Sequence, residues 1–522
     1  MPRRFLSLFL CAVSLAAQPP ATKPKLLLVV VIDQFRYDYL TRFRAEYRGG
    51  FTRLWEHGAV FTNAHYMHVP TVTAIGHSTV LTGATPSVSG IVGNEWYDRA
   101  LKRMVTSVSD SETQLLGGAA GQTGASPRRL LVSAVPDEMK IAGKASIAIG
   151  ISIKDRSAIL PPGHMADAAY WFDEASGHFV SGTYYEPALP AWVQRFDDAQ
   201  PAAKYKTAEW RALDAKPGDP PFCSMAVGNG PRACRTLEAT PFGNELLEAF
   251  AEQTIENEAL GTHAATDVLT VSFSSNDYVG HALGPDSAEV RDVSVRTDLT
   301  LGKLFDFIDA RLGAGNTLVV LTSDHGVAPV PEVNTARKMP GGRIDATEFL
   351  TTLTKALDGK FGEGQWLIPN TGGTLYLDYE ELAAHKIDAK DARRALADSA
   401  KAFPHIARVY TRDEIEAGAD TADTVGRTMR NGYYGPRSGD VFVLPEPYYI
   451  FSGHGATRGT THGSPYGYDT HVPVIFLGPG VRPGVYRRNI AVNDIAPTLA
   501  AIFDVEPPSG AFGDVLPEAV GH

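Results

Sequence analysis

The chain has 522 residues, of which 44% are hydrophobic and 20% are charged. This is the composition of an ordinary globular protein, so disordered and fibrous classes are excluded, and the length allows a large core with a smaller added domain. With 48 basic and 59 acidic residues, the formal net charge of −11 argues against a nucleic-acid partner, because such proteins need a basic surface to displace phosphate counterions.

Residues 1–17 have the pattern of an export signal peptide. Arg3 and Arg4 precede an apolar run that ends at Leu15, and two small alanines follow it. The run is too short to cross a bilayer, which takes about 20 apolar residues, and no later stretch reaches that length. We therefore expect an exported protein, periplasmic or secreted, without a stable membrane partner. A retained N-terminal anchor is the weaker alternative.

Four short apolar runs lead to charged residues along the chain. The run 26–32 is continuous and rich in β-branched residues, which is typical of a strand buried on both faces, and it stops at Asp33. The other three runs and the residues that follow them are 147–153 with Lys154, 268–273 with Asp277, and 318–321 with Asp324 and His325. Helical spacing lies between the runs, so an α/β fold with a largely parallel central sheet flanked by helices is predicted. Ligands bind beyond the carboxyl ends of the strands in such sheets, and we expect the charged residues to converge there.

Residues 69–83 read as a turn that enters a short helix closed by Gly83, with Thr73 near the helix N-terminus. Free N–H groups and the positive end of the helix dipole can stabilise a phosphoryl group at that place. A zinc ion beside the Thr73 hydroxyl would lower its pKa and make it a nucleophile. By this local pattern alone, helix capping by Thr71 or Thr73 is the commoner role.

Several aspartates and histidines follow these predicted strands, and one more histidine lies late in the chain. They are Asp33, Asp277, His281, Asp324, His325 and the late His462. This mixture suits zinc, whereas an all-oxygen set would suit calcium or magnesium better. Each residue taken singly has an ordinary interpretation as a helix cap or a surface residue. The six together are enough for two zinc ions with open positions.

Cys223 and Cys234 are the cysteines that remain after the export signal. They are close in sequence on a segment rich in proline and glycine, and an exported compartment is oxidising enough to pair them. A local disulfide is therefore predicted, with two free thiols as the alternative. The surrounding segment, residues 171–243, is expected to be a loop-rich excursion that walls the pocket.

Five of the metal-ligand candidates lie between residues 33 and 325, and a long stretch separates them from the sixth, His462. We therefore expect a catalytic domain made of residues 24–335 and 455–520, and an inserted α/β subdomain at 336–454 beside the site.

Several short blocks occur in the order found in the alkaline phosphatase superfamily. They are Asp33-Gln34, the Thr73 segment, Gly90–Asn94, Ser152–Arg156, Asp277–His281, Ser323–Gly326 and Thr461-His462. The chain most resembles the threonine-nucleophile, phosphate-irrepressible alkaline phosphatases of bacteria. The similarity runs from about Lys25 to the C-terminus, where residues 494–498 resemble the closing helix of the superfamily.

The resemblance implies an alkaline phosphatase-like fold with two zinc ions per chain. One zinc would be bound by Asp277, His281 and His462, and the other by Asp33, Asp324 and His325 together with Thr73. One ion would activate the Thr73 alkoxide. The other would stabilise the leaving-group oxygen and later activate the water that hydrolyses the phosphothreonine.

The resemblance also implies that Asn94, Lys154 and Arg156 bind the phosphoryl group. A point-charge lysine and a forked arginine suit a monoester dianion better than a singly charged diester. The related nucleotide pyrophosphatase/phosphodiesterases lack this Lys-x-Arg pair. Other alkaline phosphatases have a third site, for magnesium, near this region. The resemblance implies that Lys154 takes its place, so no magnesium requirement is expected. Without the resemblance, Asn94 could equally be a turn residue, and the two cations would read as a solvated charge cluster.

The predicted function is hydrolysis of small-molecule phosphate monoesters to alcohol and inorganic phosphate, by a chain expected to be a monomer. A type I phosphodiesterase or nucleotide pyrophosphatase is the alternative, and Lys154 and Arg156 discriminate between the two. A catalytically silent metal- or phosphate-binding protein is a third reading. The remaining histidines near the site are expected to have supporting roles: His65, His68, His77, His454 and His471.

Overall fold

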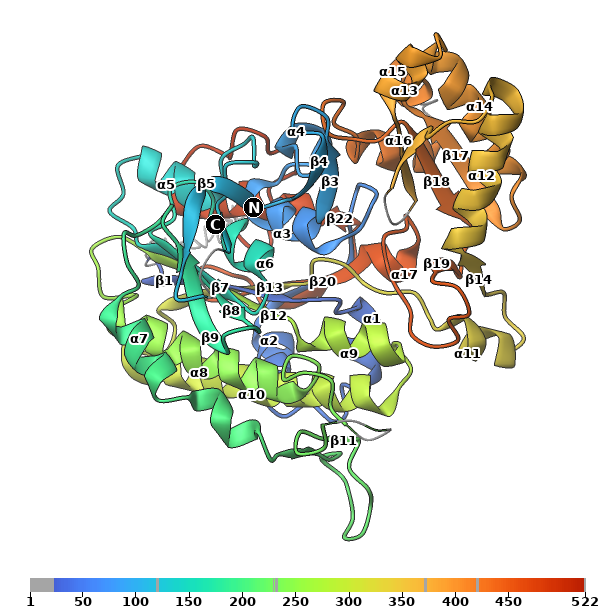
Figure 1. Cartoon of the computed structure of the whole chain (residues 1–522). Helices are drawn as coiled ribbons and strands as arrows, with labels where there is room; N and C mark the ends of the chain where they lie inside the picture. Colours follow the sequence, from blue (N-terminus) through green and yellow to red (C-terminus); the bar gives the residue numbers. More distant parts are fainter. Residues whose placement is uncertain are drawn as a thin grey trace, which may run out of the picture.

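A computed structural model of the chain describes residues 23–118, 122–228, 230, 233–369, 373–418 and 422–520. The predicted export signal, residues 1–17, lies outside the described residues. A twelve-stranded mixed sheet runs through the centre of the described chain, and a separate lobe stands beside it (Figure 1). Within these described ranges, no helix combines the length and apolar character needed to cross a membrane.

The middle of the large sheet is parallel. Its neighbouring strands are β13 (Thr317–Thr322), β1 (Leu26–Ile32), β12 (Asp267–Phe273), β7 (Ala148–Ser152) and β8 (Ala168–Asp173). Every residue of β1 is buried, as expected for a strand covered on both faces. The prediction of a largely parallel sheet is confirmed, and the four apolar runs correspond to β1, β7, β12 and β13 to within one residue at each end.

The register of these strands brings their carboxyl ends to the same edge. Ile32 at the end of β1 pairs with Phe273 at the end of β12, and Val31 pairs with Thr322 at the end of β13. Residues that follow these strands therefore begin side by side.

Antiparallel strands extend the sheet on both sides of the parallel core. On one side are β20 (His471–Leu477) and β2 (Ala59–His65), with the short β21 (Gly484–Tyr486) and β22 (Ile490–Ala491) parallel to β2. On the other are β9 (His178–Gly182), β5 (Ser109–Leu116) and β6 (Thr123–Ala125).

Helices cover both faces of the sheet (Figure 1). Side chains of β1 alternate between two hydrophobic cores, because successive strand residues point to opposite faces. Leu26, Leu28, Val30 and Ile32 pack with residues of α8 (Pro241–Asn257) and α10 (Ala288–Leu312). Leu27, Val29 and Val31 pack with residues of α3 (Thr73–Thr82), α5 (Val135–Ile141) and α18 (Ile495–Phe503).

The remaining elements of this body are short. They are α1 (Tyr37–Arg42), α2 (Gly50–His57), α4 (Pro86–Ser89), α6 (Asp155–Ile159), α9 (Ser275–Leu283), α11 (Pro331–Ala336), α17 (Gly467–Thr470), η2 (Val492–Asp494), β3 (Glu95–Asp98) and β4 (Arg103–Thr106).

The segment 171–243 is more regular than its composition predicts. It contains β9, α7 (Ala191–Asp198), η1 (Pro201–Tyr205) and the pair β10 (Glu209–Trp210) and β11 (Cys223–Ser224). Its aromatic side chains explain the order, because Phe179 stacks on Phe250 of α8 with ring centroids 3.8 Å apart. Cys223 and Cys234 form the predicted disulfide, with their Cα atoms 5.0 Å apart.

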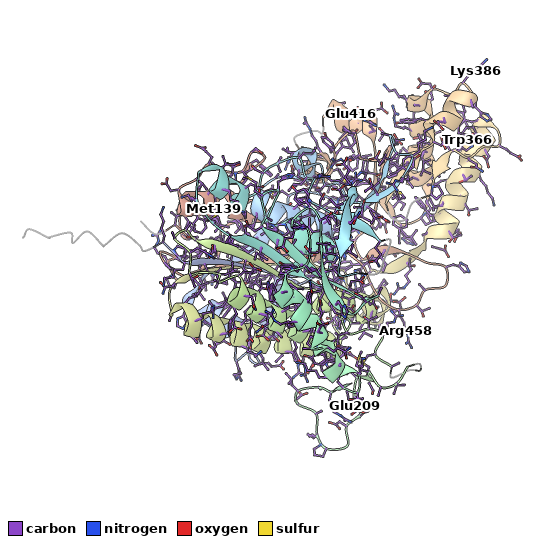
Figure 2. The ribbon with its side chains drawn as sticks, turned by 60° about the vertical axis from the view of Figure 1, so that its left-hand side comes forward. Met139, Glu209, Trp366, Lys386, Glu416 and Arg458 are labelled. Atoms are coloured by element: carbon purple, nitrogen blue, oxygen red, sulfur yellow. A yellow bond between two sulfur atoms is a disulfide. The ribbon has the colours of Figure 1, made fainter. Side chains whose placement is uncertain are left out.

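The lobe is built from residues between β13 and β20. A four-stranded sheet contains β15 (Leu367–Ile368), β16 (Thr374–Leu377), β18 (Val441–Pro445) and β17 (Ile406–Thr411). Around it lie α12 (Ala346–Phe361), α13 (Tyr379–Ala384), α14 (Ala389–Ala402), α15 (Arg412–Ala417) and α16 (Thr424–Asn431), and β14 (Gly342–Asp345) pairs with β19 (Tyr449–Ser452). The lobe has a hydrophobic core of its own that includes Leu353, Leu396 and Val443. Trp366 and Lys386 of the lobe stand far from Met139 of α5 in Figure 2.

Candidate active site

One edge of the parallel sheet collects the predicted metal-ligating residues. Asp33 directly follows β1, and Asp324 and His325 follow β13 after one serine. Asp277 and His281 lie one turn apart on α9, which begins just after β12. Asp33, Asp277, Asp324 and His325 are brought together, because the strand register aligns the ends from which they emerge, and His281 contacts Asp277 from the next turn of α9.

Asp33, Asp324 and His325 form the first ligand group, with ligand atoms all within 4.8 Å of one another. Nε2 of His325 lies 3.5 Å from Oδ1 of Asp33 and 3.3 Å from Oδ2 of Asp324. These two carboxylate oxygens are buried and accept no hydrogen bond from the described part of the chain. Burial and the nearby Asp277 and Asp324 carboxylates raise the pKa of Asp33. Unpartnered buried oxygens that face one imidazole nitrogen fit a bound cation.

Asp277, His281 and His462 form the second ligand group. Nε2 of His281 lies 3.2 Å from both Oδ1 of Asp277 and Nε2 of His462. His325 stacks on His462 with ring centroids 3.5 Å apart, and Asp277, His325 and His462 also fall within 4.8 Å as a set. The two ligand groups therefore adjoin at His325.

All three histidines turn the same ring nitrogen toward the protein backbone. Nδ1 of each donates to a carbonyl oxygen, at 2.9 Å for His281, 2.8 Å for His462 and 3.0 Å for His325. A carbonyl can only accept, so Nδ1 carries the proton and Nε2 presents a lone pair to the site. This is the tautomer that a metal ligand needs. The donor set of imidazole nitrogen and carboxylate oxygen fits a divalent metal centre.

Lys154 joins the two ligand groups. Its Nζ donates to Oδ2 of Asp33 and to Oδ2 of Asp277, both at 2.6 Å. Burial alone would lower the pKa of this lysine, but the Asp277 and Asp33 carboxylates more than offset it, so the pKa is raised and the ammonium stays charged. The ammonium has three protons, so one remains for another acceptor.

Thr73 is the first residue of α3, which is fully buried and ends at Gly83 with φ 65°. The predicted helix and its glycine end are confirmed. Gly76 allows the helix to approach the first ligand group, because a Cβ there would lie 2.1 Å from the carbonyl oxygen of Asp324. Oγ1 of Thr73 lies 3.3 Å from Nε2 of His325. By contrast, the Thr71 hydroxyl donates to the Ser464 carbonyl at 3.0 Å.

Asn94 and Arg156 both belong to segments that contact α3. Oδ1 of Asn94 accepts a hydrogen bond from the Ala74 N–H at 2.8 Å, which leaves the amide NH₂ as the group able to donate. Arg156 is in the first turn of α6, which packs against α3. Nη1 of Arg156 is 3.5 Å from Oδ1 of Asp155, and its buried Nε has no hydrogen-bond partner among the described residues. Both side chains can therefore donate to an anion.

Gln34 supports both ligand groups, a role that the sequence analysis did not assign. Its N–H donates to Oδ1 of Asp324 at 3.1 Å, and its Nε2 donates to Oδ1 of Asp277 at 2.6 Å. The residue has φ 62°, a left-handed conformation that is uncommon outside glycine. A Cβ at Gly280 would lie 1.9 Å from Oε1 of Gln34. The glycine in Asp277–His281 was the available signal for this close approach.

The other histidines differ in their relation to the site. His77 lies one turn after Thr73 on α3. Its ring contacts the Ser272 hydroxyl at 2.7 Å and Oδ2 of Asp324 at 3.3 Å, so it supports the Asp324 carboxylate. His454 is 88% exposed and pairs with Asp345 at 2.6 Å. The rings of His65 and His471 stack with centroids 4.6 Å apart. Burial lowers the pKa of His68 to about 3.

Asp469 of α17 fixes the loop that carries His462. Its Oδ2 accepts from the Gly463 N–H at 3.1 Å, the Ser464 N–H at 2.8 Å and the Ser464 hydroxyl at 2.6 Å. Its carbonyl oxygen accepts from the N–H of the residue after His325 at 2.7 Å. Asp469 thus ties together two backbone segments that carry ligands, and no local sequence pattern indicates this role.

Replacing Asp469 with alanine should lower metal affinity about 10- to 100-fold, because supporting hydrogen bonds of this kind orient ligands. Asp469→Asn should retain most of the affinity. Its amide oxygen can accept the same three hydrogen bonds. Zinc titration against a chromophoric chelator measures both variants. Equal losses in the two would contradict the positioning role.

Comparisons with known proteins agree with this geometry. A model of the type I phosphodiesterase / nucleotide pyrophosphatase family matches residues 27–469. The alkaline phosphatase PafA of Elizabethkingia meningoseptica is 35% identical over 96% of this chain and 95% of its own, and PhoV of Synechococcus elongatus is 36% identical over 95% and 92%. A protein of Myroides odoratus named calcium-transporting ATPase is 35% identical over 95% of both chains.

The crystal structure of wild-type PafA superposes with a TM-score of 0.89 at 34% identity, covering 97% of this chain and all of that one. The alkaline phosphatase-like fold predicted from the sequence is thereby confirmed. The matched region contains every residue of both ligand groups, together with Thr73, Asn94, Lys154 and Arg156. The chain belongs to the type I phosphodiesterase / nucleotide pyrophosphatase family, and its relatives of similar length include bacterial alkaline phosphatases.

Proposed function

We propose that this protein is an alkaline phosphatase that hydrolyses phosphate monoesters to alcohol and inorganic phosphate, with a covalent phosphothreonine at Thr73. The observation that carries the proposal is the position of the Thr73 hydroxyl. It lies at a helix N-terminus, 3.3 Å from the histidine at which two adjoining ligand groups meet. A hydroxyl in that place can be deprotonated and face a phosphoryl group held by helix N–H groups.

Two zinc ions per chain are part of the proposal. Asp277, His281 and His462 would hold one, and Asp33, Asp324 and His325 with Thr73 would hold the other. The fit rests on the unpartnered carboxylate oxygens and on the common Nε2 orientation of the histidines. When bound, such ions supply Lewis-acid stabilisation of attacking and leaving oxygens and lower the pKa of a hydroxyl or water.

The remaining roles belong to side chains of the chain itself. Thr73 attacks the phosphorus with Oγ1, the alcohol leaves, and water later releases phosphate from the phosphothreonine. The Asn94 amide donates to a non-bridging oxygen. Arg156 donates through its guanidinium, whose Nε has no partner among the described residues, and Lys154 donates through its third proton. A phosphate monoester carries about two negative charges and a diester carries one, so two cations suit the monoester better.

A type I phosphodiesterase remains the second candidate, because the matching family description names that activity. Two observations favour the monoesterase. The relatives with about 35% identity over nearly the whole chain are named alkaline phosphatases in two cases. The two cations near Thr73 add positive charge suited to a dianion.

We further propose that the protein is exported to the periplasm or beyond, with residues 1–17 as its signal peptide, and that it acts as a monomer on small molecules. The disulfide between Cys223 and Cys234 supports an oxidising compartment. We also propose that residues 336–454 are an inserted subdomain of a catalytic domain made of 24–335 and 455–520. The separate hydrophobic core of the lobe supports this division.

The deciding measurement is kcat/KM for nitrophenyl phosphate and for bis(nitrophenyl) phosphate at alkaline pH, with zinc and then with a chelator. We expect a preference for the monoester by orders of magnitude, loss of activity with the chelator, and recovery when zinc is added back. A preference for the diester would assign the protein to the phosphodiesterases. Metal binding without any turnover would identify a silent binding protein.

A further inference from the structure

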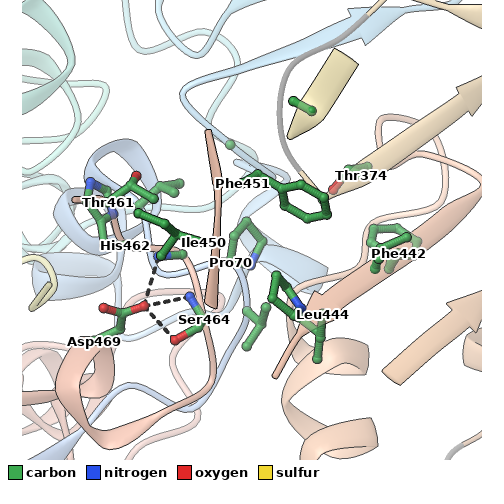
Figure 3. A pocket seen from close by; sticks show the side chains of 18 of the residues that line it. Pro70, Thr374, Phe442, Leu444, Ile450, Phe451, Thr461, His462, Ser464 and Asp469 are labelled. Atoms are coloured by element: carbon green, nitrogen blue, oxygen red, sulfur yellow. Dashed lines mark hydrogen bonds between the residues drawn. The ribbon is translucent and has the colours of Figure 1, made fainter. Parts of the chain in front are cut away.

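A cavity of about 760 Å³ opens beside the candidate active site (Figure 3). His462 and Asn94 line it at the site, together with Pro70 and Val72 of the segment that precedes Thr73. This volume is in the range of small-molecule pockets and far exceeds what a phosphoryl group fills. The described residues that line it include none from the excursion at 171–243, so the prediction that this excursion walls the pocket is not met here.

The lobe supplies much of the lining, and that part includes four large apolar side chains. Phe442 and Leu444 come from β18, and Ile450 and Phe451 come from β19. Figure 3 shows Phe451, Leu444 and Phe442 on one side of Pro70, and Ile450 beside His462 on the other. An apolar surface stabilises a ligand roughly in proportion to the apolar area that it removes from water.

Three of the hydroxyl groups around the cavity donate to the protein. The Tyr466 hydroxyl donates to the Pro445 carbonyl at 2.7 Å, and the Tyr376 hydroxyl donates to the Arg437 carbonyl at 3.1 Å. The Ser464 hydroxyl donates to Asp469 at 2.6 Å. These three hydroxyls could donate to a sugar or polyol only by giving up a bond to the protein, which is costly.

The described residues of the lining also carry no side chain that is permanently positive. Among the described residues that line the cavity there is no lysine or arginine, while Glu95 and Asp469 are carboxylates. Further phosphate groups on a substrate, as in a nucleoside polyphosphate, would find no positive partner there.

We infer that this cavity holds the alcohol part of the substrate, and that the preferred substrates are phosphate monoesters of apolar alcohols, aryl alcohols in particular. The inference rests on the proposed phosphatase function and deepens it. The phosphoryl group lies at Thr73, and the alcohol part extends past Asn94 and His462 toward Phe451. The lobe thus selects the leaving group while the sheet edge carries out the chemistry.

Phe451 offers a test with a matched control. Phe451 and Phe403 are both partly buried and both pack on Phe349, each with ring centroids 5.1 Å away. Phe451 lines the cavity, and Phe403 is not among its described lining residues. Substituting either with alanine removes a similar ring from the same core, so the loss of stability should be comparable.

The readout is the ratio of kcat/KM for 1-naphthyl phosphate to kcat/KM for methyl phosphate. The two esters differ in intrinsic reactivity, but this difference is the same for every variant and cancels when the ratios of two variants are compared. Phe451→Ala should lower this ratio about tenfold, since the ring contact is lost only for the larger alcohol. Phe403→Ala should leave the ratio unchanged. The inhibition constant of inorganic phosphate should be the same in both variants, because phosphate does not reach Phe451.

An unchanged ratio in Phe451→Ala, or equal changes in the two variants, would overturn the inference while leaving the proposed function intact. Failure of the wild-type protein to hydrolyse either monoester would overturn the proposed function and this inference with it.

Discussion

Replacing Thr73 with alanine is expected to lower kcat/KM for nitrophenyl phosphate by at least about 10⁴-fold, the scale seen when an enzyme loses its nucleophile. In the proposed mechanism this hydroxyl accepts the phosphoryl unit, and alanine has no group to replace it at the helix start. Intact-mass measurement after acid quench should show one added phosphoryl group on the wild-type protein and none on the variant.

Thr79→Ala is the control for this experiment. Thr79 is buried on the same helix, and its hydroxyl donates to the Ile75 carbonyl at 2.9 Å. It should retain near-normal turnover, and both variants should bind metal to the same extent. A Thr73→Ala variant that still carries a phosphoryl group would move the nucleophile elsewhere. Thr71 would be tested first, although its hydroxyl is bonded to the Ser464 carbonyl.

Removing Arg156 should separate monoester from diester hydrolysis. Arg156→Ala is expected to lower kcat/KM for the monoester about 10²- to 10³-fold, the usual cost of losing one preorganised donor to transition-state charge. The loss for bis(nitrophenyl) phosphate should be much smaller, because a diester carries one negative charge and presents fewer free oxygens. The same two substrates used to assign the function measure the effect.

A charge-matched control is available in Arg337. Its side chain is 56% exposed and pairs with Asp286 at 2.8 Å, so Arg337→Ala removes one positive charge without touching the site. It should change neither rate by more than a small factor. Equal losses on both substrates in Arg156→Ala would contradict the role assigned to this arginine.

The parts of the fold predicted best from the sequence are those with a strong local signal. β1 matches its predicted range at both ends, because a strand buried on both faces must be apolar at every position. The end of helix α3 was also predicted correctly, because glycine favours the left-handed conformation that ends a helix and Gly83 adopts it. The candidate ligands were found because they directly follow such strands or carry the motifs of a known superfamily.

The features that sequence could not predict depend on contacts between distant residues. Gln34 reaches Asp277 across 243 positions, and its left-handed backbone has no local signature. Asp469 acts on a loop five to six residues away that has no regular structure. The order within 171–243 depends on aromatic packing against α8. The apolar cavity exists only because the lobe stands opposite the Thr73 segment, which no single stretch of sequence encodes.

The spacing of the ligands along the chain also bears on when the site can form. Asp33 is near the start of the described residues, and His462 follows the whole lobe. A polypeptide that is still being synthesised therefore lacks the second ligand group until His462, the last of its three residues, has been added. Metal binding at the second group would then require a chain that has emerged past His462.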